Sequence, residues 1–176
     1  PVQIYWEMNQ DRTPRFETTY AEWPASQTET WTQYFQPDGS LATSPPGDVE
    51  SVSSSYTYAP RGPLDQLISR DGNGRLQWPP QPDGTYVAFT SDALEEDHVL
   101  LGSGCVELWL ESTADDTDIE VTLSEIRPDG SEMYVQNGWL RASHRVEDPA
   151  RSEPRRPWHT HAPEDYELLP DEFVRM

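Results

Sequence analysis

The amino-acid sequence predicts an all-β protein, an antiparallel sandwich whose strands have Greek-key or jelly-roll connections. Three observations support this fold class. Helical periodicity is nearly absent, apolar residues recur at every second position, and tight-turn signals separate the alternating segments. We therefore expect about 8 strands and little helix.

Two alternating segments in the second half of the chain give the clearest strand signal. Residues 105–111 and residues 119–124 alternate apolar with mostly polar side chains, which predicts strands with one buried and one wetter face. The expected buried faces hold Val106, Leu108 and Leu110 in the first segment and Ile119, Val121 and Leu123 in the second. Shorter β-prone segments predict further strands at residues 2–6, 30–35, 86–90 and 133–135.

The turn signals are regular. Pro-Asp-Gly occurs at residues 37–39, 82–84 and 128–130. Pro presets φ, Asp caps the turn and Gly accepts a positive φ, so each triplet predicts a tight turn. Residues 71–74 predict a fourth turn. The flanks of the triplets do not match, so they are not an internal repeat.

Two segments are typical of long loops. Residues 44–63 are rich in Ser, Pro and Gly, with only isolated aromatic residues. Residues 145–163 contain four Pro and many charged side chains, and we expect them to lie as extended coil across a surface.

The composition limits the possible partners. The chain has twelve arginines, no lysine and 32 acidic residues, which give a net charge of −20. This charge excludes a nucleic-acid-binding protein that works by neutralising phosphate, and it disfavours adhesion to anionic membranes. We therefore expect neither nucleic acid nor a membrane as partner. The acidity fits either adaptation to high salt or ordinary solubility. The 34% hydrophobic content suffices for one core, which predicts a single domain over residues 1–176.

The ends of the sequence suggest its context. The first residues, Pro1 to Ile4, lack a start Met and show no secretory signal, and no apolar run is long enough to span a bilayer. We expect an excerpt or processed piece of a longer chain, located in the cytoplasm.

Nucleophilic and cysteine chemistry find little support. Cys105 is the only cysteine, which excludes an internal disulfide and a cysteine-based metal cluster. Ser103, between Gly102 and Gly104, lacks the spacing of the nucleophile elbow of serine hydrolases. We predict that it forms a turn that leads into the strand at residues 105–111.

Two clusters invite a metal interpretation. His159 and His161 would lie on one face of an extended segment, with Glu164 and Asp165 nearby and His98 and His144 distant. We favour instead a polar loop whose Trp158 packs on the sandwich.

The second cluster is Asp115, Asp116 and Asp118, which could hold calcium. The calcium-loop pattern is absent, and we favour carboxylates that brace a turn by accepting backbone N–H groups. We therefore predict no catalytic, cofactor-binding or metal-binding residue in this chain.

The aromatic content is high, with seven Trp and eight Tyr. Such side chains could form a sugar-stacking platform or anchor a domain interface. Trp109 alternates away from the expected buried face, so it must pack on something else. We favour a docked domain as its partner.

Short motifs follow one another along almost the whole chain. They lie at residues 22–24, 34–35, 38–41, 56–60, 89–97, 102, 106–110, 112–118, 127–130 and 138–142. In this order they resemble the C-terminal domain of the X-Pro dipeptidyl-peptidase and cocaine-esterase-like (CocE/NonD) serine hydrolases. One departure is Ala59, which stands where the family has Asp.

The resemblance implies a galactose-binding-like jelly-roll β-sandwich behind an α/β-hydrolase catalytic domain of the same polypeptide. The family's catalytic Ser, Asp and His lie upstream, so this chain is not itself expected to be an enzyme. Its parent would be a serine peptidase or esterase acting on X-Pro peptides or acyl esters. The domain would dock on the catalytic domain and help to wall the substrate cleft. A free-standing carbohydrate-binding module is the alternative.

The resemblance also bears on the C-terminal end. The family continues past the equivalent of residues 168–172 into further strands, whereas this chain stops at Met176. We expect closing strands to be missing, although residues 168–176 approach a strand pattern themselves. An open edge would make the isolated chain poorly soluble or form a homo-oligomer by edge pairing.

Overall fold

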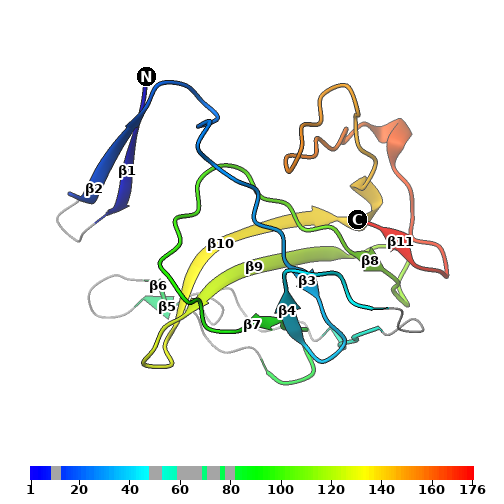
Figure 1. Cartoon of the computed structure of the whole chain (residues 1–176). Helices are drawn as coiled ribbons and strands as arrows, with labels where there is room; N and C mark the ends of the chain where they lie inside the picture. Colours follow the sequence, from blue (N-terminus) through cyan, green and yellow to red (C-terminus); the bar gives the residue numbers. More distant parts are fainter. Residues whose placement is uncertain (9–12, 48–52, 59–68, 71–75, 78–81) are drawn as a thin grey trace. The chain divides into compact units, whose positions relative to one another are not determined.

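The computed structural model describes residues 1–8, 13–47, 53–58, 69–70, 76–77 and 82–176 (Figure 1). These residues form eleven strands and two short 3₁₀ helices, and they contain no α-helix. The predicted all-β class is therefore confirmed, while jelly-roll connectivity stays a prediction. None of the described helices is long or apolar enough to cross a membrane.

The strands build five small sheets, with the orders β1-β2, β3-β4-β7, β5-β6, β9-β10 and β8-β11. The 3₁₀ helices are Ala142–His144 and Pro163–Asp165. The strands are β1 (Val2–Met8), β2 (Pro14–Tyr20), β3 (Tyr34–Phe35), β4 (Ser40–Ala42), β5 (Ser69–Arg70), β6 (Leu76–Gln77), β7 (Thr90–Ser91), β8 (Trp109–Leu110), β9 (Asp118–Ile126), β10 (Glu132–Arg141) and β11 (Val174–Arg175).

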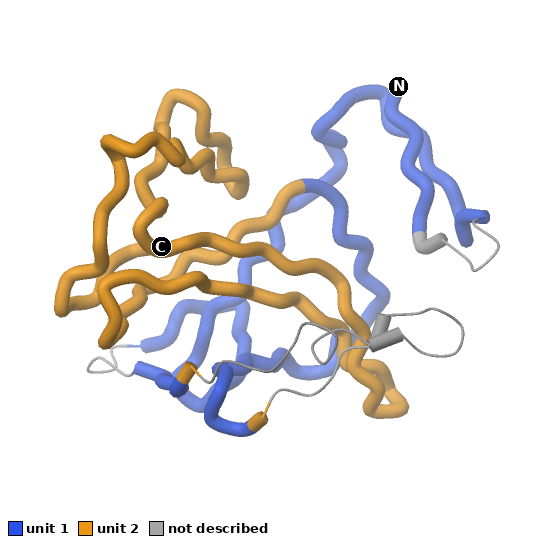
Figure 2. The backbone as a smooth tube through the Cα atoms, turned by 180° about the vertical axis from the view of Figure 1, so that it is seen from behind, with its two compact units in different colours: residues 1–57, 83–102 blue, residues 58–82, 103–176 orange. Residues whose placement is uncertain are grey.

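The chain divides into two compact units (Figure 2). Unit 1 contains residues 1–57 and 83–102, and unit 2 contains residues 58–82 and 103–176. Unit 1 holds the β1-β2 hairpin and the β3-β4-β7 sheet, in which β4 pairs with β7 in parallel. Unit 2 holds the other three sheets. The expected single domain over residues 1–176 stays a prediction.

The Pro-Asp-Gly turns form as predicted. Gly39, Gly84 and Gly130 have φ angles of 84°, 79° and 81°. Residues with a Cβ atom rarely adopt such positive φ angles, whereas glycine does so readily. Asp38 and Asp129 each accept hydrogen bonds from the hydroxyl and amide of the serine two residues later, and these bonds lower the pKa of both carboxyls. The turn predicted at residues 71–74 lies outside the described residues.

The longest sheet is the β9-β10 hairpin of unit 2, whose strands join through the third Pro-Asp-Gly turn (Figure 1). Arg141 pairs with Asp118 at one end, and a bulge lies between Tyr134 and Gln136. One face of β9 carries the predicted Ile119, Val121 and Leu123. Residues 133–135 lie in β10, so both strand predictions for this region are confirmed.

Other predicted strands are shorter than expected. Only Trp109 and Leu110 of residues 105–111, and only Tyr34 and Phe35 of residues 30–35, are in strands. Residues 86–90 contribute only Thr90, to β7. A strand requires a partner over its whole length, and β11 supplies one only for residues 108–110. The strand character expected near the C-terminus is present in β11.

The loop at residues 145–163 differs from the predicted extended coil. It folds back on itself, because Glu147 bridges to His159 and Glu153 bridges to Arg156. The amide of Asp148 also donates to the Trp158 carbonyl at 2.8 Å. Pro149 and Pro154 lie at turns, for which the fixed φ of proline is suited. In residues 44–63, the described parts contain neither helix nor strand, as predicted.

Burial is sparse among the described residues. Only Ala25, Ala142, Ser143 and Leu169 are buried. Two members of the predicted core faces, Val106 and Leu123, are 44% and 48% exposed, so their predicted burial was wrong. Val106 lies outside β8, and the two-stranded β9-β10 sheet offers Leu123 few neighbours, so both side chains stay partly open to water.

The positive φ of Gly130 makes a testable prediction for the β9-β10 turn. Gly130→Ala should lower the free energy of unfolding by about 1 kcal/mol, because Ala is strained in this conformation. Gly138→Ala in β10 is the control, since its Cβ would meet open space and its φ is not positive. Urea unfolding followed by tryptophan fluorescence measures both; equal effects would contradict the turn assignment.

Candidate functional site

The turn predicted at Ser103 is not assigned in the structure, where of residues 102–104 only Gly102 forms a bend. Ser103 is exposed in a coil segment that follows Gly102, whose φ is 111°. The next residues continue as coil, with no helix after them, so the geometry is not that of a nucleophile elbow. Cys105 is exposed.

Asp116 links the segment before β9 to the 3₁₀ helix at residues 142–144 in unit 2. Its carboxylate accepts the amide of Ser143 at 2.9 Å and its hydroxyl at 2.7 Å, and it also accepts the amide of Thr117. Ser143 is completely buried. Burial raises the pKa of Asp116, but the bonds from Ser143 and Thr117 outweigh it and hold the pKa below its ordinary value. The carboxylate is therefore ionised and engaged at neutral pH.

Asp118 is engaged in a different way. Arg141 donates to both of its carboxylate oxygens, at 2.7 and 2.8 Å, across the end of the β9-β10 hairpin. This hydrogen-bonded pair lowers the pKa of Asp118. The structure therefore shows Asp116 bracing a turn, as predicted, while Asp118 pairs with a cation of the neighbouring strand.

The histidines of unit 2 lie closer together than predicted. His144 was expected to be distant, but its ring centroid lies 5.3 Å from that of His161, and His159 lies 6.3 Å from His161. The fold-back of the loop and the 3₁₀ helix at residues 142–144 bring the rings together. Among the described residues, no group of three or more His, Cys, Asp or Glu is arranged to hold a metal ion.

Trp158 contacts an arginine of its own loop. Its side chain is 42% exposed, and the guanidinium carbon of Arg151 lies 3.9 Å from the ring centroid. The ring thus forms a cation–π interaction within the loop, and its packing on the sandwich stays a prediction. A depression of about 410 Å³ lies beside it, lined by Arg151, Pro157, Trp158, His159, Thr160 and His161.

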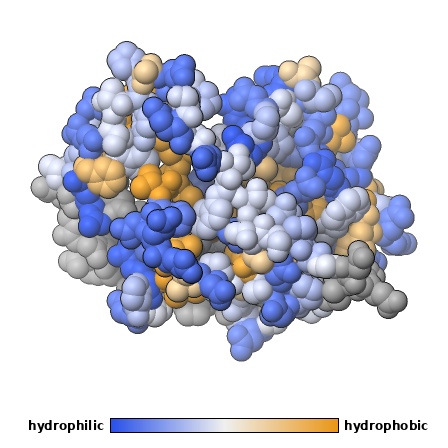
Figure 3. Space-filling model, in the orientation of Figure 1, coloured by the Kyte–Doolittle hydropathy of each residue, from blue (hydrophilic) through white to orange (hydrophobic). Residues whose placement is uncertain are grey.

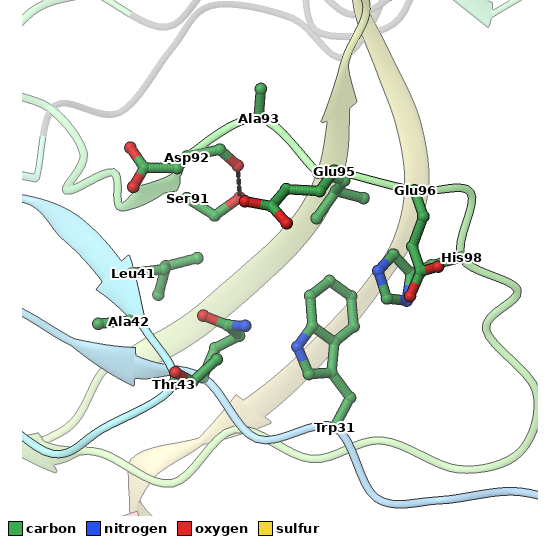
Figure 4. A pocket seen from close by; sticks show the side chains of 12 residues that line it. Trp31, Leu41, Ala42, Thr43, Ser91, Asp92, Ala93, Glu95, Glu96 and His98 are labelled. Carbon is green, nitrogen blue, oxygen red and sulfur yellow. Dashed lines mark hydrogen bonds between the residues drawn. The ribbon is translucent and has the colours of Figure 1, made fainter.

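Unit 1 contains a pocket of about 680 Å³ (Figure 4). Trp31 and His98 stack at one side, with ring centroids 5.1 Å apart and planes at 9°. Strand β4 supplies Leu41 and Ala42, and the segment after β7 supplies three carboxylates. These are Asp92, Glu95 and Glu96. The sequence showed the acidic run but gave no sign that Trp31 lies beside it.

Apolar side chains reach the surface in patches among hydrophilic ones (Figure 3). Trp109 is 64% exposed, as its alternation predicted, while Leu108 and Leu110 on the other face of the strand are half-buried. Trp139 of β10 is 66% exposed and pairs across the sheet with Glu120. Side chains of this size and exposure are typical of domain interfaces rather than of catalytic groups.

Comparison with known proteins adds three findings. The family model described as "X-Pro dipeptidyl-peptidase C-terminal non-catalytic domain" matches residues 1–176. Two proteins named "Putative serine esterase", from Mycobacterium bovis and Mycobacterium tuberculosis, are each 28% identical to the chain over 185 residues. The match covers 100% of this chain and 28% of each relative. No solved structure matches.

The Asp116 brace predicts an acid-sensitive contribution to stability. Asp116→Ala should lower the free energy of unfolding by about 2 kcal/mol at neutral pH, since it leaves the buried Ser143 donors unpaired. The control is Asp115→Ala, which removes the same charge from an exposed neighbour.

The pH dependence gives this prediction its sign. Because folding lowers the pKa of Asp116, its contribution is present above the unfolded pKa of about 3.9 and is lost as the pH falls through the folded value. The difference between wild type and Asp116→Ala in urea melts should therefore shrink at acid pH. A difference independent of pH, or an equal effect of Asp115→Ala, would contradict the brace.

Proposed function

The chain belongs to the family of X-Pro dipeptidyl-peptidase C-terminal non-catalytic domains, and from this premise we propose its role in a longer protein. It docks on the α/β-hydrolase catalytic domain of the same polypeptide and helps to wall the substrate cleft. We also propose that its strands have jelly-roll connectivity and that the protein lies in the cytoplasm.

The proposed parent is a serine hydrolase acting on X-Pro peptides or acyl esters. The chain spans about 28% of the length of the two mycobacterial relatives, which are named as serine esterases, so their remaining length leaves room for a catalytic domain. In such a parent a serine attacks the carbonyl carbon, a histidine transfers the proton, and an oxyanion hole holds the developing charge. Those groups belong to the catalytic domain.

The exposure of Trp109 is the observation that carries the docking part of this proposal. A 64% exposed indole next to half-buried Leu108 and Leu110 has a well-defined strand position but little cover. Trp is strongly enriched among residues that dominate interface energies, because its large apolar surface is released from water on binding. A docked catalytic domain supplies that cover.

Two carboxylates of unit 2 support a non-catalytic role in the cleft wall. Asp116 is committed to Ser143, and Asp118 is committed to Arg141. Carboxylates held in this way stabilise the domain and are not free to act on a substrate.

A free-standing carbohydrate-binding module is the second candidate, and the pocket of unit 1 favours it. Trp31 lies there with the polar side chains of Gln33, Thr43 and Ser91, a mixture of aromatic and hydrogen-bonding groups that suits a sugar ring. His98 already stacks on Trp31, which reduces the aromatic surface left for a ligand. Saturable binding on a glycan array would favour this candidate over the first.

The non-catalytic role predicts a simple assay result. The isolated chain should not hydrolyse p-nitrophenyl acetate above a heat-treated control, while the longer parent should, since the reacting groups lie outside this chain. Turnover by the isolated chain that is lost on heating would contradict the proposal. An inactive parent would contradict the proposal that it is a serine hydrolase.

Docking through Trp109 predicts a difference between two exposed tryptophans in the parent. Trp109→Ala should speed proteolysis at the domain junction, because loss of a buried interface Trp costs about 2 kcal/mol or more of interface energy. Trp158→Ala is the control, since its ring faces Arg151 of its own loop. Limited proteolysis of the folded parent measures both. Equal cleavage rates for wild type and Trp109→Ala would contradict docking through this residue.

A further inference from the structure

The β1-β2 hairpin of unit 1 has two chemically different faces. Its register pairs Ile4 with Thr18, Trp6 with Phe16 and Val2 with Tyr20, so these side chains share one face. The opposite face carries Gln3, Tyr5, Glu17 and Thr19. Among the described side chains, the first face holds no charged group. It consists of Val2, Ile4, Trp6, Pro14, Phe16, Thr18 and Tyr20.

The side chains of this apolar face hold one another in place. The rings of Trp6 and Phe16 stack with centroids 5.6 Å apart and planes at 19°. The indole N–H of Trp6 donates to the Thr18 hydroxyl at 2.7 Å. On the other face the Gln3 amide donates to the Glu17 carboxylate. These contacts fix the register, so the apolar face is preorganised.

Among the described residues, this face is only partly shielded from water. The hairpin is a two-stranded sheet of its own, and none of the described side chains on its apolar face is buried. Phe16 is 47% exposed, and the others are half-buried. An isolated two-stranded hairpin is marginally stable in water, so it needs a surface against which this face can pack.

We propose that the apolar face of the β1-β2 hairpin docks on an apolar surface of the catalytic domain of the same polypeptide. This inference rests on the proposed function and names a docking element for it. The family model describes the domain as C-terminal, so in the proposed parent the catalytic domain precedes it and the hairpin, near the N-terminal end of the matched residues, lies towards that domain. Covalent linkage there gives the two surfaces a high effective concentration.

Charge also favours this face as the point of approach. The chain carries a net charge of −20, and an acidic surface repels acidic groups on a partner. The described apolar face carries none of that charge, so a partner surface pays little electrostatic cost there. A partner with an apolar patch fits it, whereas a strongly basic partner would fit the acidic parts of the chain.

Hydrogen exchange of the full-length parent tests the proposal with a matched pair of variants. Phe16→Glu places a charge on the apolar face, and Tyr5→Glu places the same charge on the opposite face, at a residue that is 55% exposed. Phe16→Glu should speed exchange of the β1 and β2 amides about tenfold or more, since the hairpin loses its cover. Tyr5→Glu should change it less than about twofold.

A measurement on the unmodified parent guards against simple unfolding of the variant hairpin. Under hydroxyl-radical oxidation, with each rate divided by that of the free amino acid, Phe16 should react far more slowly than Tyr5, although the two are 47% and 55% exposed in this chain. Equal oxidation of Phe16 and Tyr5, or equal effects of the two Glu variants, would overturn the proposal. If the parent is a dimer and only Phe16→Glu makes it monomeric, the proposal is also overturned, because the hairpin would then dock on a second copy of the chain.

The outcomes separate this inference from the proposed function. Protection of Trp109 in the parent without protection of the hairpin would leave docking in place and refute the hairpin as a docking element. If neither Trp109 nor the hairpin is protected in the wild-type parent, docking itself is refuted. Protection of the hairpin in wild type that Phe16→Glu removes and Tyr5→Glu retains supports both.

Discussion

Sheets of two or three strands cannot bury both the apolar faces they create and the edges they leave, and this constraint governs both units. Only four of the described residues are buried, three of them small or mid-sized apolar residues. Phe16, Trp109 and Leu123 stay 47%, 64% and 48% exposed on well-defined strands. Phe16 and Leu123 lie on faces with the pattern of a core, whereas Trp109 lies on the face opposite Leu108 and Leu110. We propose that a docked domain covers these side chains.

In unit 2, hydrogen bonds rather than a large apolar core hold together the segments around Asp116 and Glu167. The Asp116 carboxylate satisfies the buried Ser143, and Arg145, which is 13% exposed, donates to the carbonyl and carboxylate of Glu167. The first contact joins the segment before β9 to the 3₁₀ helix after β10, and the second joins Arg145 to the segment that precedes β11. A scaffold held in this way presents its aromatic side chains at fixed positions without burying them, which suits a domain that binds another protein surface.

The sequence predicted what local chemistry determines. Pro-Asp-Gly fixes its own turn geometry, and alternation identified residues 119–124 as part of β9 before any partner strand was known. The spacing of motifs also predicted the family correctly. Non-local pairing escaped prediction: the fold-back of residues 145–163 and the approach of His144 to His161 depend on contacts between distant residues. The second strand of the first hairpin, β2, was missed although Phe16, Thr18 and Tyr20 share a face.

A crystal structure of the longer parent chain would test the central claim most directly, that this chain is a non-catalytic domain completed by a catalytic domain. The account predicts an α/β-hydrolase domain before residue 1 of this chain, with its nucleophile elbow outside these 176 residues. It also predicts that Trp109 and the apolar face of the β1-β2 hairpin are buried against that domain. A parent in which both remain open to solvent, or in which no hydrolase domain precedes the chain, would contradict the account.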